Sequence, residues 1–345
     1  CWELMAIAST FLILARKTEK SLKAAQRYIL VHLAGGLILL TGILLAIQAT
    51  GSIAFTSKVL TQNEMAKYFI LLGILINAAA VPFSSWLPDA YPESTIMGGI
   101  FLSAYTTKTA VYTLIRGFPG EELLIPIGCV MTLYGIIYAL LENDMRRILA
   151  YSIINQVGFM VCGVGIGTNL AIAGVVAHAF CHIIYKALLW MSAGAVLYRT
   201  GKSKCTELGG LYKTMPITTG LCLVGAASIS AFPLFSGFVS KSMVMVAAAE
   251  EERFTRKKHD YDYPRNAIDF CLNQRNITGK DLEYVVFFEK PFVKFDRLLR
   301  TSLQGFPRTH SLFVQSMRTW LFDKLWIKSL IARSLEIEKS RVLFC

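Results

Sequence analysis

The sequence predicts an all-α polytopic membrane bundle with broken helices, followed by a small soluble α/β fragment. Two observations predict the bundle. The chain of 345 residues is 54% hydrophobic and only 17% charged, which is too apolar for an ordinary globular protein. Its apolar residues also gather in stretches of about 20, the length that crosses the hydrocarbon core of a bilayer. A third observation predicts the soluble fragment, because these stretches stop near residue 248 and a charged sequence begins.

Spanning segments follow one another from the start of the chain. Residues 2–15 are predicted to form the end of a helix. Spanning segments are then predicted over 28–49, 68–87, 95–115, 123–141, 148–166, 170–198 and 217–240. Because Cys1 stands where an initiator Met is expected and the chain opens inside an apolar segment, we expect a truncated start.

Prolines interrupt two of these segments: Pro82 and Pro88 in the second, and Pro233 with Gly237 in the last. Proline removes a backbone donor and clashes with the preceding turn, so both helices are expected to be broken or kinked. Paired broken helices point to the ion pathway in transporters. The simpler alternative is that proline is frequent in membrane helices generally.

The connections between segments alternate in their content of Lys and Arg. The basic residues of the first, fifth and seventh connections are Arg16, Lys17, Lys20, Lys23 and Arg27, then Arg146 and Arg147, then Arg199, Lys202, Lys204 and Lys213. The positive-inside rule makes these connections cytoplasmic and predicts seven crossings of the inner membrane. The acidic third connection, Trp86–Glu93, breaks the pattern. We expect the soluble fragment in the cytoplasm, subject to whether residues 236–249 complete a crossing.

Ionisable side chains occur inside the apolar segments. They are Glu3, Lys108, His178, His182, Lys186 and Lys241. A charge at the bilayer centre costs roughly 2.5–3.5 kcal/mol on insertion scales, so such residues persist mostly where they carry protons or ions. The sequence therefore predicts an ion or proton conductor.

The strongest cluster is His178, His182 and Lys186, which recur at i, i+4 and i+8 and share one helix face. An imidazole accepts and passes on protons near neutral pH, and burial helps a lysine to release its proton. Together they form a candidate proton relay. Two alternatives remain open: the histidines could be packed and hydrogen-bonded without a transport role, or could hold a metal ion, for which no third ligand is evident.

Three further residues are ambiguous. Lys108 lies seven residues from the end of its segment and could snorkel to the interface. His32 is favoured as a polar residue at a helix interface. Lys241 follows the broken segment and could be either a pathway lysine or a helix-end anchor.

The sequence after Ala249 predicts a soluble α/β piece, with an amphipathic helix over 264–275, a strand at 285–288 and a helical stretch over 311–334. Eight cysteines without a CxxC pair suggest neither a disulfide framework nor a zinc site. No P-loop or nucleophile elbow appears, so we expect no cofactor, no metal and no catalytic residue. The net charge of +12 suits an anionic membrane surface and does not form a nucleic-acid-binding stripe.

Residues 1–245 resemble the proton-conducting antiporter-like subunits of respiratory complex I, membrane-bound hydrogenases and Mrp antiporters. The motifs that carry the resemblance are WELM (2–5), WLPDAYP (86–92), KTAVYTLIR (108–116), DMRRILAYSIINQVGF (144–159), HAFCHIIYKALLWMSAGAVLYRTG (178–201) and ELGGLYKTMP (207–216). The last two are most similar to the Mrp D-type subunit.

This resemblance implies a bundle of two inverted five-helix repeats, each with a broken helix and a half-channel. It implies that Glu3 tunes the first half-channel and that Lys108 connects it to a central axis formed by the His178, His182 and Lys186 side chains. Lys241 would be the distal charged residue of the second broken helix.

The sequence departs from the family pattern at one position. Asn77 stands where the family usually has a lysine, nine residues before the Trp of WLPDA. An amide cannot titrate, which puts the Glu–Lys switch of the first half-channel in doubt. His32 is a candidate replacement partner for Glu3.

Residues 246–345 resemble a different family, the NodU-type O-carbamoyltransferases, through VAAAEEERFTRKKHD (246–260) and the YPRNAIDFCL that follows. The metal-binding histidine motif of that family is expected directly after Cys345. We therefore expect a truncated fragment with little prospect of carbamoyl transfer.

Three hypotheses follow. The first is proton or cation/proton translocation by residues 1–245, a domain truncated at both ends that works with other membrane subunits in an oxidoreductase or antiporter complex and is not an enzyme by itself. The ions would be protons and, in an antiporter, sodium. The second is a membrane-tethered carbamoyltransferase. The third is a chimera of two gene fragments, inactive as a whole.

Overall fold

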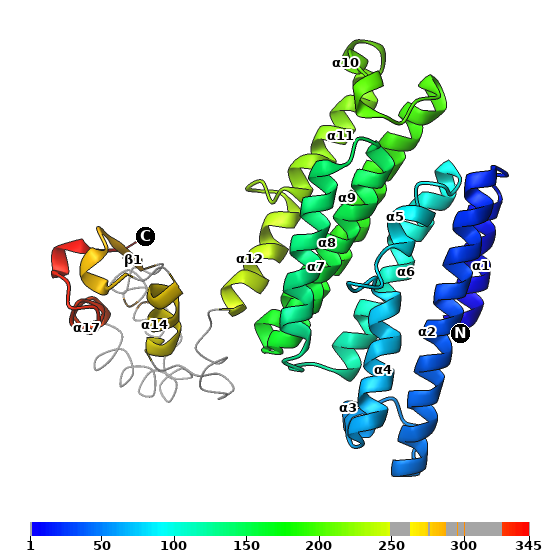
Figure 1. Cartoon of the computed structure of the whole chain (residues 1–345). Coiled ribbons are helices and arrows are strands. Elements are labelled where there is room, and N and C mark those ends of the chain that lie inside the picture. The colour runs from blue at the N-terminus through cyan, green and yellow to red at the C-terminus, as the bar shows by residue number, and fades with distance from the viewer. Residues whose placement is uncertain are drawn as a thin grey trace. The chain divides into compact units, whose positions relative to one another are not determined.

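The computed structural model describes residues 2–248, 263–274, 277–287, 295, 300 and 326–344. Contacts divide the chain into two compact units, Cys1–Ala248 and Ala249–Cys345. The first unit is all-α, and the second combines helices with two short paired strands (Figure 1).

The helices of the first unit follow the predicted segments. They are α1 (Trp2–Leu14), α2 (Glu19–Thr50), α3 (Ser57–Thr61), α4 (Glu64–Asn77), α5 (Trp86–Ala90), α6 (Ile96–Gly117), α7 (Leu124–Leu141), α8 (Met145–Ile166), α9 (Asn169–Thr200), α10 (Leu211–Thr214), α11 (Pro216–Ile229) and α12 (Ser236–Ala248). By length and apolar composition, four helices in the described part of the chain are able to cross a membrane: α2, α7, α8 and α9. The helix α6 and the pairs α4–α5 and α11–α12 correspond to the other predicted crossings.

The long helix α9 lies at the centre of the second half of this unit. It packs against α6, α8, α11 and α12, and Figure 1 shows it beside α8. In the first half, α2 packs against α1 and α4. A side chain on the inner face of α9 therefore meets neighbours from four helices.

The two expected helix breaks are present and use the same backbone turn. In the first, α4 ends at Asn77 and Ala79 adopts a left-handed conformation with φ of 59°. In the second, α11 ends at Ile229 and Ala231 has the same φ of 59°. Each alanine is followed by a backbone N–H that bonds a carbonyl five residues earlier, at 2.9 Å in the first break and 3.0 Å in the second. The repeated turn fits the expectation of two related halves.

Two of the residues expected to interrupt the helices do not do so. Pro88 is the third residue of α5, where its missing N–H removes no helical bond because the first four N–H groups of a helix have no partner within it. Gly237 is the second residue of α12, and a β-carbon there would collide with the backbone carbonyl of Ser228 in α11. Glycine at position 237 therefore allows the two half-helices α11 and α12 to pack closely against each other.

The first, third, fifth and seventh connections between the helices meet at one end of the bundle. We call this end the basic end; it consists of residues 15–18, 91–95, 142–144 and 201–215. Arg16 contacts Glu93 at 3.2 Å, and backbone bonds join Met145 to Ser203 and Cys205 to Asn143. The acidic third connection thus lies at the same end as the basic connections, because its carboxylates form ion pairs with their arginines. A second ion pair of this kind joins Arg27 to Asp89 at 2.8 Å.

The second, fourth and sixth connections meet at the opposite end of the bundle. Lys67 pairs with Glu121 at 2.8 Å, and the Gly120 N–H donates to the Val164 carbonyl at 2.9 Å. The last turn of α12 belongs to this end as well, since Ala247 is buried in a small cluster with Ile166 and Ala171. The helix α12 therefore ends away from the basic end.

The second unit contains α14 (Arg265–Gln274), α17 (Ile327–Ser334), β1 (Val285–Phe287) and β2 (Val342–Phe344). The strands pair in parallel with Val285 opposite Val342. A small core of Ile331, Ala332, Leu335 and Val342 packs against partly buried residues of α14 and β1. The predicted amphipathic helix and strand are confirmed; of the helical stretch predicted over 311–334, residues 311–325 lie outside the described residues.

The left-handed alanine of the second break yields a testable prediction. A non-glycine residue in this conformation costs roughly 1–2 kcal/mol, so Ala231→Gly should be neutral or slightly stabilising despite the greater entropy of glycine in the unfolded chain. Ala226→Gly, in the interior of α11, should lower stability by about 1 kcal/mol. Thermal unfolding of both variants in detergent measures the difference, and equal losses would contradict the assigned turn.

Candidate functional site

Three ionisable side chains lie together on the inner face of α9. His178, His182 and Lys186 are all fully buried, and the ring centroids of the two histidines are 6.2 Å apart. Their four-residue spacing places them on one stripe of the helix, and α9 as a whole packs against α6, α8, α11 and α12. The shared face predicted from the sequence is present.

Two of these three residues have no hydrogen-bond partner in the described part of the chain. They are Lys186, at its Nζ atom, and His182, at both ring nitrogens. Burying polar groups without partners is costly, and more so when they are charged.

Lys108 of α6 is buried and does not reach an interface. Its Nζ donates to the Ser103 carbonyl at 2.6 Å and to Thr107 Oγ1 at 3.2 Å, and only 7% of the residue is exposed. Snorkelling is therefore the wrong alternative for this lysine.

Lys241 of α12 lies at the second helix break. Its Nζ donates to the carbonyl of Ile229, the last residue of α11, at 2.6 Å. The carbonyls at a helix end lack partners within the helix and attract cations. The structure thus shows Lys241 bonded to a helix end, and its role as a pathway lysine stays a prediction.

The structure brings in two residues that the sequence reasoning missed. His178 Nε2 lies 3.1 Å from Gln156 Oε1 on α8, and His178 Nδ1 lies 3.0 Å from Ser240 Oγ on α12. Tyr185 also donates to Gln156 Oε1, at 3.4 Å. The sequence held a signal for each: Gln156 is an amide within the motif at 144–159, and Ser240 is a hydroxyl directly before Lys241.

These contacts give no support to a metal ion held by the two histidines. Both ring nitrogens of His178 already face protein partners. Within the described ranges, no three His, Cys, Asp or Glu side chains form a group that could hold a metal.

The first half of the bundle has a different polar pair. His32 of α2 bonds through Nδ1 to Asn77 Oδ1 at 2.7 Å and packs against the Trp86 ring. The carboxyl group of Glu3 on α1 packs against Gly36 of α2, in the space that a β-carbon at Gly36 would occupy. Its Oε2 has no partner in the described residues. Asn77 bonds only Nδ1 of His32, and Nε2 of His32 has no partner in the described part of the chain, so the suggested pairing of His32 with Glu3 stays a prediction. His32 is a polar residue at the α2–α4 interface.

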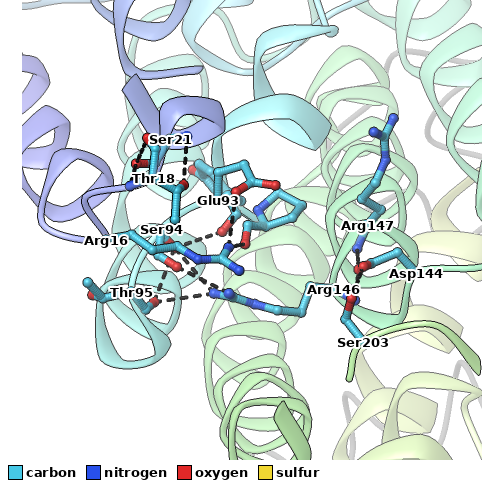
Figure 2. A network of polar contacts seen from close by, with 12 residues as sticks. Arg16, Thr18, Ser21, Glu93, Ser94, Thr95, Asp144, Arg146, Arg147 and Ser203 are labelled. Atoms are coloured by element: carbon cyan, nitrogen blue, oxygen red, sulfur yellow. Dashed lines mark hydrogen bonds and ion pairs between the residues drawn. The ribbon is translucent and has the colours of Figure 1, made fainter. Parts of the chain in front are cut away.

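A buried guanidinium organises the basic end. Arg146, the second residue of α8, donates to the Ser94 carbonyl at 3.1 Å and to the Thr95 carbonyl at 3.2 Å, and lies over the Trp190 ring of α9 at 5.2 Å. Figure 2 shows it pointing to Ser94 and Thr95, near the pair formed by Arg16 with the Glu93 segment. The same figure shows Asp144 accepting from the backbone at the start of α8 and from Ser203.

Comparison with known families decides what this bundle is. A family model described as the transmembrane region of NADH:quinone oxidoreductase and Mrp antiporters matches residues 1–255, well over half of the chain. The chain belongs to this family. The predicted all-α membrane fold and the predicted resemblance to this family are therefore confirmed.

Curated relatives in this family include the D-type component of the Na(+)/H(+) antiporter of Alkalihalophilus pseudofirmus, which is 31% identical over 73% of this chain and 55% of the relative. Hydrogenase-4 component B of Escherichia coli is 30% identical over 70% of this chain and 40% of the relative. The chain thus spans about half the length of the curated relatives it matches.

Solved structures show the same fold. The Mrp complex of Dietzia sp. DQ12-45-1b superposes with a TM-score of 0.67 at 28% identity, over 71% of this chain and 49% of that one. An archaeal membrane-bound sulfane sulfur reductase superposes with a TM-score of 0.68 at 24% identity, over 80% of this chain and 60% of that one.

A second family model, the carbamoyltransferase N-terminus, matches residues 236–342. It confirms the resemblance of the C-terminal part and overlaps the antiporter-family match by residues 236–255. Two families therefore meet at the end of α12.

The basic end supplies the next prediction. Arg146→Lys should lower stability by about 2–4 kcal/mol, because lysine cannot bond the Ser94 and Thr95 carbonyls together while stacking on Trp190 and remains a buried charge. Arg147→Lys is the matched control, since Arg147 is partly exposed and forms one ion pair with Glu142 at 2.9 Å; its loss should not exceed about 1 kcal/mol. Thermal unfolding in detergent tests both, and equal effects would argue against the role of Arg146.

Proposed function

We propose that the chain is a proton-conducting membrane subunit that works beside other membrane subunits in a multi-subunit complex. The observation that carries this proposal is the fully buried amine of Lys186, which has no hydrogen-bond partner among the residues that the structure describes. A membrane helix retains such a group mostly where it exchanges protons or ions. Membership of the antiporter and oxidoreductase family supports the same conclusion.

In this proposal protons move by successive protonation along Lys108, Lys186, His182 and His178 towards Lys241. The charges of Lys108 and Lys241 both act on Lys186 and on the two histidines. A proton bound at one group disfavours a proton at the next, so an arriving proton promotes release further along.

We assign this path to the second half of the bundle. In the first half, the position that would hold a titratable partner of Glu3 is Asn77, and its amide is bonded to His32. An amide neither binds nor releases protons at ordinary pH. Glu3 is assigned an electrostatic role at the edge of the path, and Na⁺ is the candidate exchanged cation because several relatives are described as Na(+)/H(+) antiporter subunits.

Replacing Lys186 tests the proposal. The matched segment of the Alkalihalophilus D-type component would be replaced by residues 2–248, which form one compact unit, and everted vesicles would be assayed for proton movement on adding Na⁺. Lys186→Ala should lower the rate at least about tenfold, because the relay loses its central proton acceptor. Lys213→Ala, on the exposed residue of α10, should leave the rate unchanged. Normal transport by Lys186→Ala would refute the role.

We also propose that the basic end faces the cytoplasm, as the positive-inside rule requires. Because α12 ends beside Ile166 and Ala171 at the opposite end, an odd number of crossings separates the first connection from Ala248. The chain after Ala248 then continues from the non-cytoplasmic side, and this proposal replaces the expectation of a cytoplasmic fragment.

Two exposed cysteines test the orientation. Cys205 lies at the basic end and Cys271 in the second unit. A membrane-impermeant maleimide should label Cys271 in intact cells whose outer membrane has been opened, and Cys205 only in everted vesicles. Variants that retain one of the two cysteines supply the control, and labelling of both from the same side would contradict the proposed orientation.

A second candidate function is a membrane-tethered carbamoyltransferase, favoured by the family match over 236–342. The fragment matches only the N-terminal model of that family, so we place this candidate below proton conduction. We propose domain limits of 1–245 and 246–345 and a junction of two unrelated fragments. Uninterrupted sequencing of the source DNA across the codons for Lys241 to Arg253 distinguishes a natural fusion, with an unbroken frame, from such a junction.

A further inference from the structure

A row of amide groups connects α7 to the relay histidine. Asn155 Nδ2 donates to the backbone carbonyl of Thr132 at 2.8 Å, and Gln156 Nε2 donates to Asn155 Oδ1 at 2.5 Å. The row continues to His178, whose Nε2 lies 3.1 Å from Gln156 Oε1. The row starts at the Thr132 carbonyl, which must be an acceptor because a backbone carbonyl only accepts hydrogen bonds.

The fixed acceptor at one end determines every orientation along the row. Asn155 must turn its NH₂ group to the Thr132 carbonyl, so its oxygen faces Gln156. Gln156 must then direct its own NH₂ to that oxygen, since a flipped Gln156 would bring two amide oxygens together. The Gln156 oxygen is thereby directed at α9, where it also accepts the Tyr185 hydroxyl at 3.4 Å.

An oxygen facing His178 Nε2 requires a proton on that nitrogen. We infer that Gln156 is a positioning residue that keeps a proton on Nε2 of His178, so that His178 takes up and releases its mobile proton at Nδ1, on the side of α12. The tautomer follows from the geometry alone, while its consequence for transport rests on the proposed function. The orientation of one amide thus determines which helix the relay histidine exchanges protons with.

The hydroxyl of Ser240 can follow the protonation of His178. It lies 3.0 Å from Nδ1, and it also lies within hydrogen-bond distance of the Ser236 and Gly237 carbonyls, at 3.3 and 3.4 Å. With neutral His178, Ser240 donates to the Nδ1 lone pair. When Nδ1 binds a proton, the ring N–H donates to Ser240 Oγ and the hydroxyl hydrogen turns to a carbonyl in the first turn of α12. The only covalent bond formed is the new N–H, the two hydrogen bonds of Ser240 are rearranged, and Lys241 is the next residue along α12.

The test reads the tautomer directly. The full chain, labelled with ¹⁵N-histidine and reconstituted in lipid bilayers, would be examined by solid-state NMR at alkaline pH, where the ring is neutral. The His178 signals are those lost in His178→Asn. The expected result is one tautomer with the proton on Nε2. Protonation at Nδ1 in the unaltered chain would overturn the inference.

Variants separate Gln156 from its surroundings. Gln156→Met keeps the length of the side chain but removes the acceptor, and the preference for the Nε2 tautomer should fall by about tenfold, as for loss of one hydrogen bond. Gln156→Glu keeps an acceptor and should preserve the tautomer. Gln48→Met, on an exposed position of α2, is the matched control and should change nothing. An unchanged tautomer in Gln156→Met would overturn the inference.

A variant on another helix keeps the proposal falsifiable if Gln156→Met fails to fold. Ser240→Ala removes the partner of Nδ1 and should leave the proton on Nε2; a switch to Nδ1 would show that Ser240 determines the tautomer and would overturn the inference. The NMR result does not depend on transport. Loss of transport with the expected tautomer would therefore count against the proposed function alone.

Discussion

In a membrane-spanning bundle, every backbone polar group needs a partner within the protein, and the two helix breaks are where this constraint is hardest to meet. At the first break the carbonyl of Ile76, next to the last residue of α4, accepts both the Ala79 N–H and the Trp86 indole N–H, each at 3.1 Å. At the second, the carbonyl of Ile229, the last residue of α11, accepts the Lys241 amine at 2.6 Å. A side chain without a mobile proton thus bonds the half-helix end in one half, and a titratable side chain does so in the other.

That difference extends to the rest of each half. Around the first break, Nδ1 of His32 bonds Asn77 and aromatic rings enclose the pair, while Nε2 of His32 has no partner in the described residues. Around the second, α9 gathers two histidines and a lysine. Within the same described residues His182 and Lys186 have no hydrogen-bond partner, whereas both ring nitrogens of His178 are bonded, to Gln156 and Ser240. The first half therefore holds one imidazole against an amide, and the second gathers the three groups on which proton exchange is proposed to depend.

Much of this could be predicted from the sequence, since segment length, proline positions and four-residue spacing directly reflect helix geometry. The helices, both breaks and the shared face of His178, His182 and Lys186 were predicted on that basis. Partners across helices could not be predicted, because they depend on rotation about each helix axis. For this reason the bond between His32 and Asn77 was not predicted. Gln156 and Ser240 were missed because an uncharged amide or hydroxyl has no distinctive pattern. The acidic third connection contradicted the charge pattern until its pairing with Arg16 and Arg27 was seen.

That pairing has a consequence for how the protein enters the membrane. The stretch from Ala78 to Thr95 contains no Lys or Arg, so it has no basic residue of its own to retain it on the basic side during synthesis. The residues that hold it there, Arg16 and Arg27, are made earlier. The correct threading of the first broken helix thus depends on a segment already inserted, and neutralising both arginines would affect biogenesis before it affected the stability of the finished bundle.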